Sequence, residues 1–281
     1  MTRREATLIL RGILRPVAGE DSAFEAAQLI KGLCRNADTV DDAKWAELLN
    51  CANRRALGEP LQYILGEWSF YGYDFYLSPA ALIPRQDSET LVTAALNFCM
   101  AQRKPLDILD LCCGTGCLGL ALVKKLTESL SCRDDSPAVA DPAPRINLAL
   151  ADISDSALNL ATRNSARHGV AARLVLGDLF ENLQGAQYDL ILCNPPYLSA
   201  EDMTVLQREL QYEPALALCG GADGLDFYRR LANEAPAHLA RGGRLFMEIG
   251  STQSQAVADL FSGAELMRDL SGNPRVAVWG K

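Results

Sequence analysis

The sequence predicts an α/β protein in which a doubly wound, largely parallel sheet follows a small all-helical N-terminal domain. Residues 1–65 carry helical patterns with almost no strand pattern, whereas from about residue 90 short apolar runs alternate with helical stretches. A glycine-rich turn separates the first of these runs from the helix after it. Strands that alternate with helices in this way are typical of βαβ units, whose strands pair in parallel.

The composition is that of a globular protein and favours neither a membrane-spanning chain nor a nucleic-acid-binding one. Of its 281 residues 49% are hydrophobic and 22% charged, and no apolar run approaches the ~20 residues that span a bilayer. The net charge of −8 argues against a nucleic-acid partner. The start, MTRREATLILRGIL, lacks the apolar core of a signal peptide. We therefore expect a cytoplasmic monomer whose nine cysteines carry free thiols.

The helical N-terminal domain is predicted over residues 1–65. Its three amphipathic patterns cover Ala6–Leu14, Ala23–Leu33 and Ala43–Leu57. Residues 16–19, which hold a proline and a glycine, are expected to separate the first two helices, and Asp38, Thr39 or Asp41 can cap the third.

Residues 66–86 are predicted to link the two domains through a β-hairpin. The aromatic run WSFYGYDFYL at residues 68–77 is interrupted by Gly72 and Asp74 and closed by Ser78-Pro79. The aromatic side chains of the same run can also pack onto the hydrophobic core of the larger domain. The two interpretations are compatible.

The larger domain is predicted over residues 87–281. We expect helices at Ser156–His168 and Gly224–Leu239, and a flexible surface insertion at residues 127–145, which are rich in Ser, Asp and Pro. The expected strands are Asp107–Leu111, Ile146–Ala151, Arg173–Leu176, Asp189–Cys193, Arg244–Ile249 and Val276–Trp279.

The glycine turn, residues 110–119, indicates a cofactor site. Because Gly114 and Gly116 have no Cβ, the backbone can turn sharply there and approach a ligand closely, at the edge where doubly wound sheets bind cofactors. The acid ahead of the turn, Asp110, would repel a pyrophosphate but suits a cationic, methionine-like group. The turn therefore favours S-adenosylmethionine over a dinucleotide.

Two further acids follow the next two predicted strands. Asp152 can accept hydrogen bonds from ribose hydroxyls, and Asp178 can accept one from an adenine amino group. The alternative is a turn with ordinary glycines and three solvated carboxylates. Three acids at three successive strand ends favour the cofactor.

The segment Asn194-Pro195-Pro196-Tyr197 follows a buried strand pattern and carries the predicted chemistry. Two prolines remove two backbone donors and leave the carbonyls free as acceptors. The Asn194 side-chain oxygen and the Pro195 carbonyl can each accept one N–H of a planar amide or amino group, and Tyr197 can stack on it. The sequence thus predicts methyl transfer to such a nitrogen, against the alternative of a plain proline-rich loop.

We expect no metal site. The one cysteine cluster, Cys112, Cys113 and Cys117, matches no standard zinc spacing, and the chain has only two histidines, His168 and His238. These cysteines are interpreted as small apolar residues in a tight turn.

The chain resembles the release factor glutamine methyltransferases over nearly its whole length. This resemblance implies methylation, by S-adenosylmethionine, of the glutamine side chain in the GGQ loop of class I peptide chain release factors, with a helical N-terminal domain that helps to hold the release factor. Within the family, the Asn-Pro-Pro-Tyr asparagine and the next carbonyl hold the amide. The motifs that carry the resemblance are Gly58–Gly66, Leu82–Glu89, the glycine turn, Asn194–Tyr197, Tyr212-Glu213-Pro214, Gly221–Asp226 and Asp269–Val276.

One departure concerns the substrate. The turn reads Cys-Cys-Gly-Thr-Gly-Cys, and a cysteine there is similar to sister enzymes that methylate a ribosomal protein, whereas Pro84–Glu89 keeps the release-factor pattern. Three alternatives stay open: a ribosomal-protein glutamine methyltransferase, a methyltransferase for an adenine N6 or another nucleic-acid amino group, and a non-catalytic cofactor-binding module.

The predicted site consists of a cofactor set and a substrate set. Arg85 and Glu89 can equally belong to an ordinary helix start, and Glu248 is expected to be a buried structural residue of a strand. The predicted cofactor contacts are Asp110, Cys113, Gly114, Gly116, Asp152, Asp178 and Asn194. The predicted substrate contacts are Asn194, Pro195, Pro196, Tyr197, Arg85 and Glu89, with Asn194, Pro195 and Tyr197 as the catalytic group.

Overall fold

The computed structural model describes residues 1–34, 39–102, 104–131 and 145–280. The chain forms two compact units: a helical unit of residues 1–68 with 206–212, and a larger unit of residues 69–205 with 213–281. Within the described ranges, no helix is both long and apolar enough to cross a membrane.

The helical unit contains the three expected helices, α1 (Arg3–Ala18), α2 (Ser22–Leu33) and α3 (Asp42–Ala56), and a short fourth, α4 (Leu61–Leu65). Its core is built from one face of each long helix, with Leu10, Leu14, Leu29 and Leu48 fully buried. Of the suggested caps, Asp41 is the residue that caps α3, because its carboxylate accepts the Lys44 N–H at 2.8 Å.

The predicted separation of the first two helices at residues 16–19 starts three residues too early. Helix α1 continues through Pro16 to Ala18 and ends at Gly19, whose φ of +53° is left-handed. Proline is tolerated here because it lies close to the end of the helix, so that little of the hydrogen-bond ladder is lost after it.

The predicted domain boundary at residue 65 omits residues 206–212, which belong to the helical unit. The physical reason is Arg55, which is buried on α3. Its guanidinium donates to both carboxylate oxygens of Glu25, at 2.8 and 2.9 Å, and to Glu209 at 2.5 Å. A buried cation needs such partners, and one of them comes from a distant part of the chain.

The predicted hairpin is present as β1 (Glu67–Phe70) and β2 (Tyr73–Tyr76), with left-handed φ angles at Tyr71 and Gly72 in its turn. Phe70 and Phe75 are buried in the hydrophobic core of the larger unit. The aromatic run is therefore both a hairpin and a core element, as the sequence allowed.

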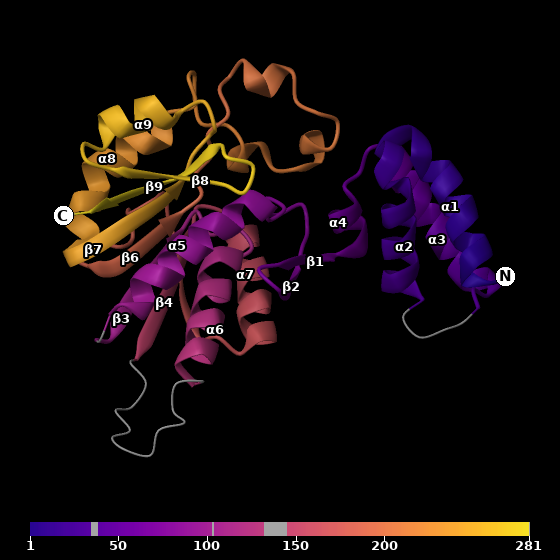
Figure 1. Cartoon of the computed structure of the whole chain (residues 1–281), viewed down its shortest axis with the longest axis horizontal. Coiled ribbons are helices and arrows are strands. Elements are labelled where there is room, and N and C mark those ends of the chain that lie inside the picture. The colour runs from indigo at the N-terminus through magenta and orange to yellow at the C-terminus, as the bar shows by residue number, and fades with distance from the viewer. Residues whose placement is uncertain (35–38, 103, 132–144, 281) are drawn as a thin grey trace. The chain divides into compact units, whose positions relative to one another are not determined.

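The larger unit is built on a seven-stranded sheet with the order β5-β4-β3-β6-β7-β9-β8 (Figure 1). Strands β3 to β7 pair in parallel, and β9 is antiparallel to both β7 and β8. The six predicted strands are all found, whereas β8 was missed because its side chains are exposed and follow no alternation. The bounds are β3 Leu106–Leu111, β4 Ile146–Asp152, β5 Ala172–Leu176, β6 Tyr188–Cys193, β7 Leu239–Glu248, β8 Glu265–Arg268 and β9 Pro274–Gly280.

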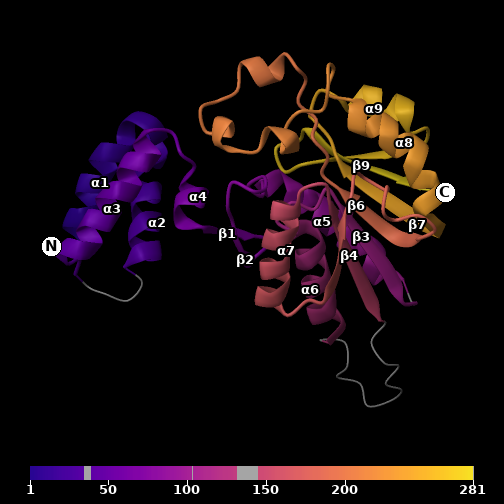
Figure 2. The ribbon, with the colours of Figure 1, turned by 180° about the vertical axis from the view of Figure 1, so that it is seen from behind.

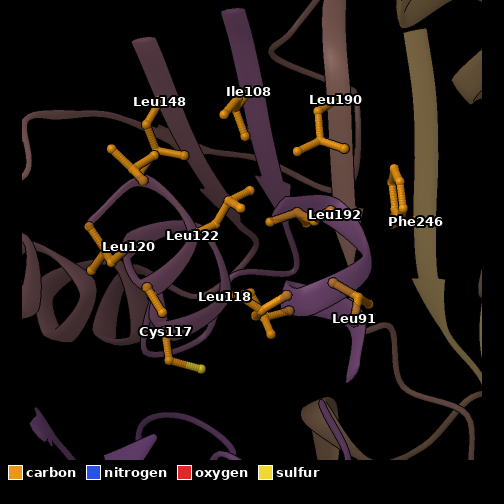
Figure 3. Packing of buried hydrophobic residues seen from close by; sticks show 14 of the residues in the cluster. Leu91, Ile108, Cys117, Leu118, Leu120, Leu122, Leu148, Leu190, Leu192 and Phe246 are labelled. Carbon is orange, nitrogen blue, oxygen red and sulfur yellow. The ribbon is translucent and has the colours of Figure 1, made fainter. Parts of the chain in front are cut away.

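Helices cover both faces of this sheet, as Figures 1 and 2 show from opposite sides. Helices α5 (Glu89–Met100), α6 (Cys117–Ser131) and α7 (Asp155–His168) pack on one face, and α8 (Asp226–His238) and α9 (Ser254–Leu260) on the other. Figure 3 shows the strand residues Ile108, Leu190 and Leu192 in one hydrophobic cluster with Leu118 and Leu122 of α6. Alternate strand residues such as Leu109 and Ile191 join the core beneath α8.

The predicted insertion at residues 127–145 is corrected at its start. Residues 127–131 are the last part of α6, because Leu126 and Leu130 continue the apolar face of that helix. Residues 132–144 lie outside the described residues.

The strand order places a topological switch at β3, which pairs with β4 on one side and β6 on the other. In doubly wound sheets the connections diverge at such a point and leave a crevice beyond the carboxyl ends of the strands. The functional site is therefore expected at the ends of β3, β4 and β6.

Candidate active site

A cavity of about 320 Å³ lies at the carboxyl ends of β3, β4, β5 and β6. Its walls come from segments that are far apart in the sequence but all belong to the larger unit. A concave, mainly apolar site with a few polar groups is what a small-molecule ligand requires. The lining residues include members of 80–84, Ser88, 111–115, 151–154, 177–179, Asn194, Pro196, 214–217, Phe227 and Arg230.

The glycine turn forms one wall of this cavity. Cys113 and Gly114 line it, and the backbone is left-handed at Cys112, Gly114 and Gly116. Gly116 does not line the cavity: a Cβ there would lie 3.1–3.3 Å from Leu120, Leu150 and Ala161. Gly116 thus lets the turn pack on the sheet, while Gly114 leaves room at the cavity surface.

Asp152, the last residue of β4, lines the cavity and joins the turn to the strand. Its Oδ2 accepts the Gly114 N–H at 2.8 Å, and its Oδ1 accepts the Ser154 N–H at 2.9 Å. Burial raises the pKa of this carboxyl above its ordinary value, and these hydrogen bonds oppose the rise. Each oxygen keeps a further lone pair with which it can accept a hydrogen bond from a ligand.

Asp178 also lines the cavity. It lies beside a cation, Arg230, that was not predicted from the sequence. Both of its carboxylate oxygens accept hydrogen bonds from Nη1 of Arg230, at 2.8 and 3.0 Å. Arg230 and Phe227 reach the cavity from α8. The helical pattern at residues 224–239 does not by itself distinguish Phe227 or Arg230 from other helix residues, so neither was a predicted site residue.

Asp110 does not line the cavity. Its carboxyl is fully buried and accepts the Gly119 N–H of α6 at 2.8 Å, while Oδ1 has no hydrogen-bond partner among the described residues. Burial raises its pKa to about 8. Side chains alternate along a strand, so Asp110 points to the face that α6 covers, together with Ile108. The structure therefore places it outside the cavity wall that Asp152 and Asp178 share, although its charge interacts with that of Asp152.

Asn194 follows directly on Cys193, the last residue of β6, and lines the cavity with Pro196. Its side-chain amide makes no hydrogen bond within the described part of the chain. Pro195 is buried and Tyr197 half-buried, and neither lines the cavity. The structure thus leaves the acceptor of Asn194 available beside the glycine turn.

Hydrogen bonds connect the Asn-Pro-Pro-Tyr loop and the residue after it to residues 218–226. Leu198 donates its N–H to the Leu218 carbonyl at 2.9 Å and accepts the Gly220 N–H at 2.8 Å. Gln253 Nε2 donates to the carbonyls of Tyr197 and Gly224, at 2.9 and 3.2 Å. Nothing in the sequence singled out Gln253, because its role depends on where α9 begins.

A charged network surrounds Tyr197, whose pKa is raised to about 12, mainly by burial. Glu248, at the end of β7, is fully buried as expected and accepts a hydrogen bond from Ser88, which lines the cavity. Burial raises the pKa of Glu248 to about 7. Arg275 pairs with Asp87 at 3.1 Å and so ties the start of β9 to the same segment.

Neither Arg85 nor Glu89 lines the cavity. The Arg85 guanidinium pairs with the buried carboxylate of Glu213. Glu89, the first residue of α5, accepts the Tyr71 N–H at 2.8 Å and thereby holds the hairpin turn. Both side chains already have partners within the protein.

Two of the three cysteines near the turn are packed in the interior of the larger unit. Cys113 and Cys117 are buried, and burial raises the pKa of Cys117 to about 12. Eight cysteines of the described part carry free thiols, and no group of three or more candidate metal ligands occurs there.

The strand order, the antiparallel β9 between β7 and β8 and the cavity at the switch point define a class of protein. This is the class I S-adenosylmethionine-dependent methyltransferase fold, with an added helical N-terminal unit, which confirms the fold class predicted from the sequence. Residues 136–215 match the "Methyltransferase small domain" and residues 19–66 the "PrmC N-terminal domain". The chain belongs to the family of release factor glutamine methyltransferases and is an enzyme.

The relatives that show this family are similar over most of their length. The release factor glutamine methyltransferase of Geobacter sulfurreducens is 42% identical over 90% of this chain and 85% of its own length. The corresponding enzyme of Bordetella pertussis is 36% identical over 87% of this chain and 86% of its own length. A ribosomal protein uL3 glutamine methyltransferase of the same organism is 36% identical over 83% of this chain and 77% of its own.

Solved structures share the fold at low identity. The catalytic domain of hMettl16, in complex with a 3′UTR hairpin, matches with a TM-score of 0.55 at 13% identity, over 93% of this chain and 91% of its own. A 16S rRNA methyltransferase of T. thermophilus, solved with AdoMet and guanosine, matches with a TM-score of 0.52 at 16% identity, over 76% of this chain and 49% of its own.

Proposed function

We propose that this enzyme transfers a methyl group from S-adenosylmethionine to the side-chain amide nitrogen of the GGQ glutamine in class I peptide chain release factors. The observation that carries the proposal is the available Asn194 amide on a proline-held loop, at the edge of a cavity that also presents Asp152. Family membership supports the choice of a glutamine side chain.

The cavity suits S-adenosylmethionine by its shape and its polar groups. We assign Asp152 to the ribose hydroxyls, because its carboxylate is held at the cavity surface by two backbone N–H groups. Asp178 remains our proposed acceptor for the adenine amino group, with Arg230 beside it. Cys113, Gly114 and Asn194 line the same cavity.

The three acids of the predicted cofactor set have two different roles in this proposal. Asp152 and Asp178 contact the ligand, whereas Asp110 supports the turn by accepting the Gly119 N–H at the start of α6. Gly116 likewise supports the turn by its packing.

The glutamine amide is a poor nucleophile because its nitrogen lone pair is delocalised into the carbonyl. We propose that the Asn194 oxygen and the Pro195 carbonyl each accept one of its N–H groups, which orients the nitrogen. S-adenosylmethionine supplies an electrophilic methyl group. Orientation of this kind is worth roughly 7–11 kcal/mol of the barrier. The two acceptors also oppose the positive charge that develops on nitrogen, so no base is needed before transfer.

Tyr197 and Pro196 remain predicted substrate contacts, of which only Pro196 lines the cavity. Tyr197 contributes through its backbone, which Gln253 holds, and through packing of its ring beneath the loop.

A ribosomal-protein glutamine is the second candidate substrate, because the uL3 enzyme of Bordetella pertussis is also a close relative. The net charge of −8 argues against a nucleic acid. We place the reaction in the cytoplasm, on the ground of the free thiols.

The test is methyl transfer from labelled S-adenosylmethionine to purified release factor, either wild type or with alanine in place of the GGQ glutamine. We expect label on the wild-type factor alone. Label on both factors would refute the assigned glutamine, and label on a ribosomal protein in place of the release factor would favour the second candidate.

The matching enzyme variant is Asn194→Ala. It should lower turnover by at least about 10³-fold, since one of the two groups that orient the amide is lost. Its affinity for S-adenosylmethionine, measured by calorimetry, should stay within about threefold of wild type. Retained turnover would contradict the mechanism.

A further inference from the structure

Two segments that line the cofactor cavity are joined at one buried carboxylate. Residues 80–84 and residues 214–217 both contribute lining residues, and about 130 positions of sequence separate them. Glu213 immediately precedes the second segment, and Arg85 immediately follows the first.

The carboxylate of Glu213 is almost fully buried, with a side-chain exposure of 1%. Its Oε2 accepts the Ile83 N–H at 2.9 Å, and its Oε1 accepts the Arg85 guanidinium. Burying a charge is costly unless it is paired and hydrogen-bonded, so both segments must stay together for this carboxylate to remain buried.

The wall formed by residues 214–217 is also tied to the Asn-Pro-Pro-Tyr loop. Just after it, the Leu218 carbonyl accepts the Leu198 N–H, and Leu198 and Cys219 form an isolated β-bridge. Leu216 lines the cavity although its exposure is 55%, so its own packing does little to fix it. The ion pair at one end and the bridge at the other therefore hold this wall.

We propose that Arg85 and Glu213 are positioning residues whose ion pair holds the 214–217 wall against the cavity and thereby sets the affinity for S-adenosylmethionine. The proposal rests on the proposed function and deepens it. It gives Arg85 a role different from the direct substrate contact that the sequence suggested. In this role neither side chain touches the methyl donor or the substrate.

The test compares Glu213→Gln, Arg85→Met, Arg85→Lys and the double variant Arg85→Met/Glu213→Gln. Lys125→Met is the matched control, because it removes an exposed cation that lies 3.8 Å from Glu128 in the same unit. For each protein, calorimetry gives the dissociation constant for S-adenosylmethionine. Kinetics give kcat and both KM values, and hydrogen exchange follows the Ile83 and Leu198 amides.

We expect Glu213→Gln and Arg85→Met to weaken S-adenosylmethionine binding about tenfold and to speed exchange at Ile83 and Leu198. The KM for the protein substrate should change less than about twofold. Arg85→Lys should retain most of the affinity, because it keeps the charge. The double variant should lose less than the sum of the single ones, since neither charge is left unpaired. Lys125→Met should match wild type.

Several results would overturn the proposal. A raised KM for the protein substrate with unchanged cofactor affinity would make Arg85 a substrate contact. The unfolded fraction of each variant is measured by thermal melting. If the affinity for S-adenosylmethionine falls only in proportion to that fraction, the ion pair has a purely structural role. Wild-type protein that fails to bind S-adenosylmethionine would refute the proposed function itself, whereas wild-type binding with unaffected variants would refute this proposal alone.

Discussion

At the scale of single residues, burial raises the pKa of three carboxyl groups near the site, those of Asp110, Asp152 and Glu248. Asp110 and Glu248 are both fully buried, and burial is the main cause of the raised pKa of each. Asp152 lies closer to the cavity surface. Burial raises its pKa as well, but two backbone N–H donors oppose this rise. Strand ends therefore carry acids with different roles, and only those at the cavity can contact a ligand.

Glu248 makes the stability of the protein depend on pH. Its pKa is raised from 4.5 to about 7, so the folded state binds the proton more tightly than the unfolded chain does. The free energy of unfolding should therefore fall as pH rises from about 4.5 to about 7, by roughly 1.4 kcal/mol per pKa unit, and then level off. In Glu248→Gln this contribution should vanish, because glutamine does not titrate.

Urea unfolding of wild type and Glu248→Gln at pH 5, 6, 7 and 8 measures this difference directly. Other titrating groups, including Asp110, are common to both proteins and cancel. We expect the stability of the variant relative to wild type to increase between pH 5 and 7. Parallel stability curves for the two proteins would contradict the assigned protonation.

At the scale of elements, the reacting loop depends on segments that approach its backbone closely. Residues 218–226 lie against Pro196–Leu198, and a Cβ at Gly224 would overlap the Tyr197 carbonyl oxygen. A Cβ at Gly220 would lie 2.7 Å from the Pro196 carbonyl oxygen. Glycines in the Gly221–Asp226 motif and just before it thus shape the loop that holds Asn194.

Gly224→Ala should lower turnover by at least about tenfold, because the added Cβ displaces the Tyr197 backbone and with it the Asn194 acceptor. Gly263→Ala is a matched control: its φ of +81° is close to the +76° of Gly224, but nothing lies within 4 Å of an added Cβ. Both changes should cost about 1–2 kcal/mol of stability through the left-handed backbone.

Steady-state kinetics and urea unfolding separate the two effects. Equal losses of activity in both variants would show that backbone strain alone accounts for the effect and that close approach to Tyr197 does not matter.

At the scale of the whole molecule, the chain enters the helical unit twice. Residues 1–68 form its helices, and residues 206–212 return to it after the Asn-Pro-Pro-Tyr loop. Within this unit Glu209 pairs with the buried Arg55, and the Tyr212 hydroxyl donates to the Leu57 carbonyl at 3.3 Å. The stability of the helical unit therefore depends on a segment located far along the chain.

Glu209→Ala should destabilise the helical unit by about 1–3 kcal/mol, because a hydrogen bond to the buried guanidinium is lost while Glu25 remains. Hydrogen exchange should quicken at the amides of α3 and stay unchanged at those of β3 and β6. Glu201→Ala, at an exposed position of the larger unit, serves as the control. Unchanged exchange in α3 would show that Glu209 does not stabilise Arg55.

The sequence by itself determined the fold class, the six principal strands and the two motifs at the cavity. Apolar periodicity reports burial directly, and glycine and proline restrict the backbone through local sterics, so residues 110–119 and Asn194–Tyr197 were recognisable without any structure. The same local logic identified the hairpin and placed Asp41 among the three residues that could cap the third helix.

Only the tertiary structure decided which side chains meet. Strand alternation turned Asp110 toward α6 and left Asp152 and Asp178 at the cavity. The partners of Arg85 and Arg55 come from residues 128 and 154 positions away, and Arg230 reaches Asp178 across 52. The physical reason is that periodicity and turn chemistry depend on residues that are close in the chain. The partner of a buried charge is instead the opposite charge that lies near it once the chain has folded, and this partner can come from anywhere in the sequence.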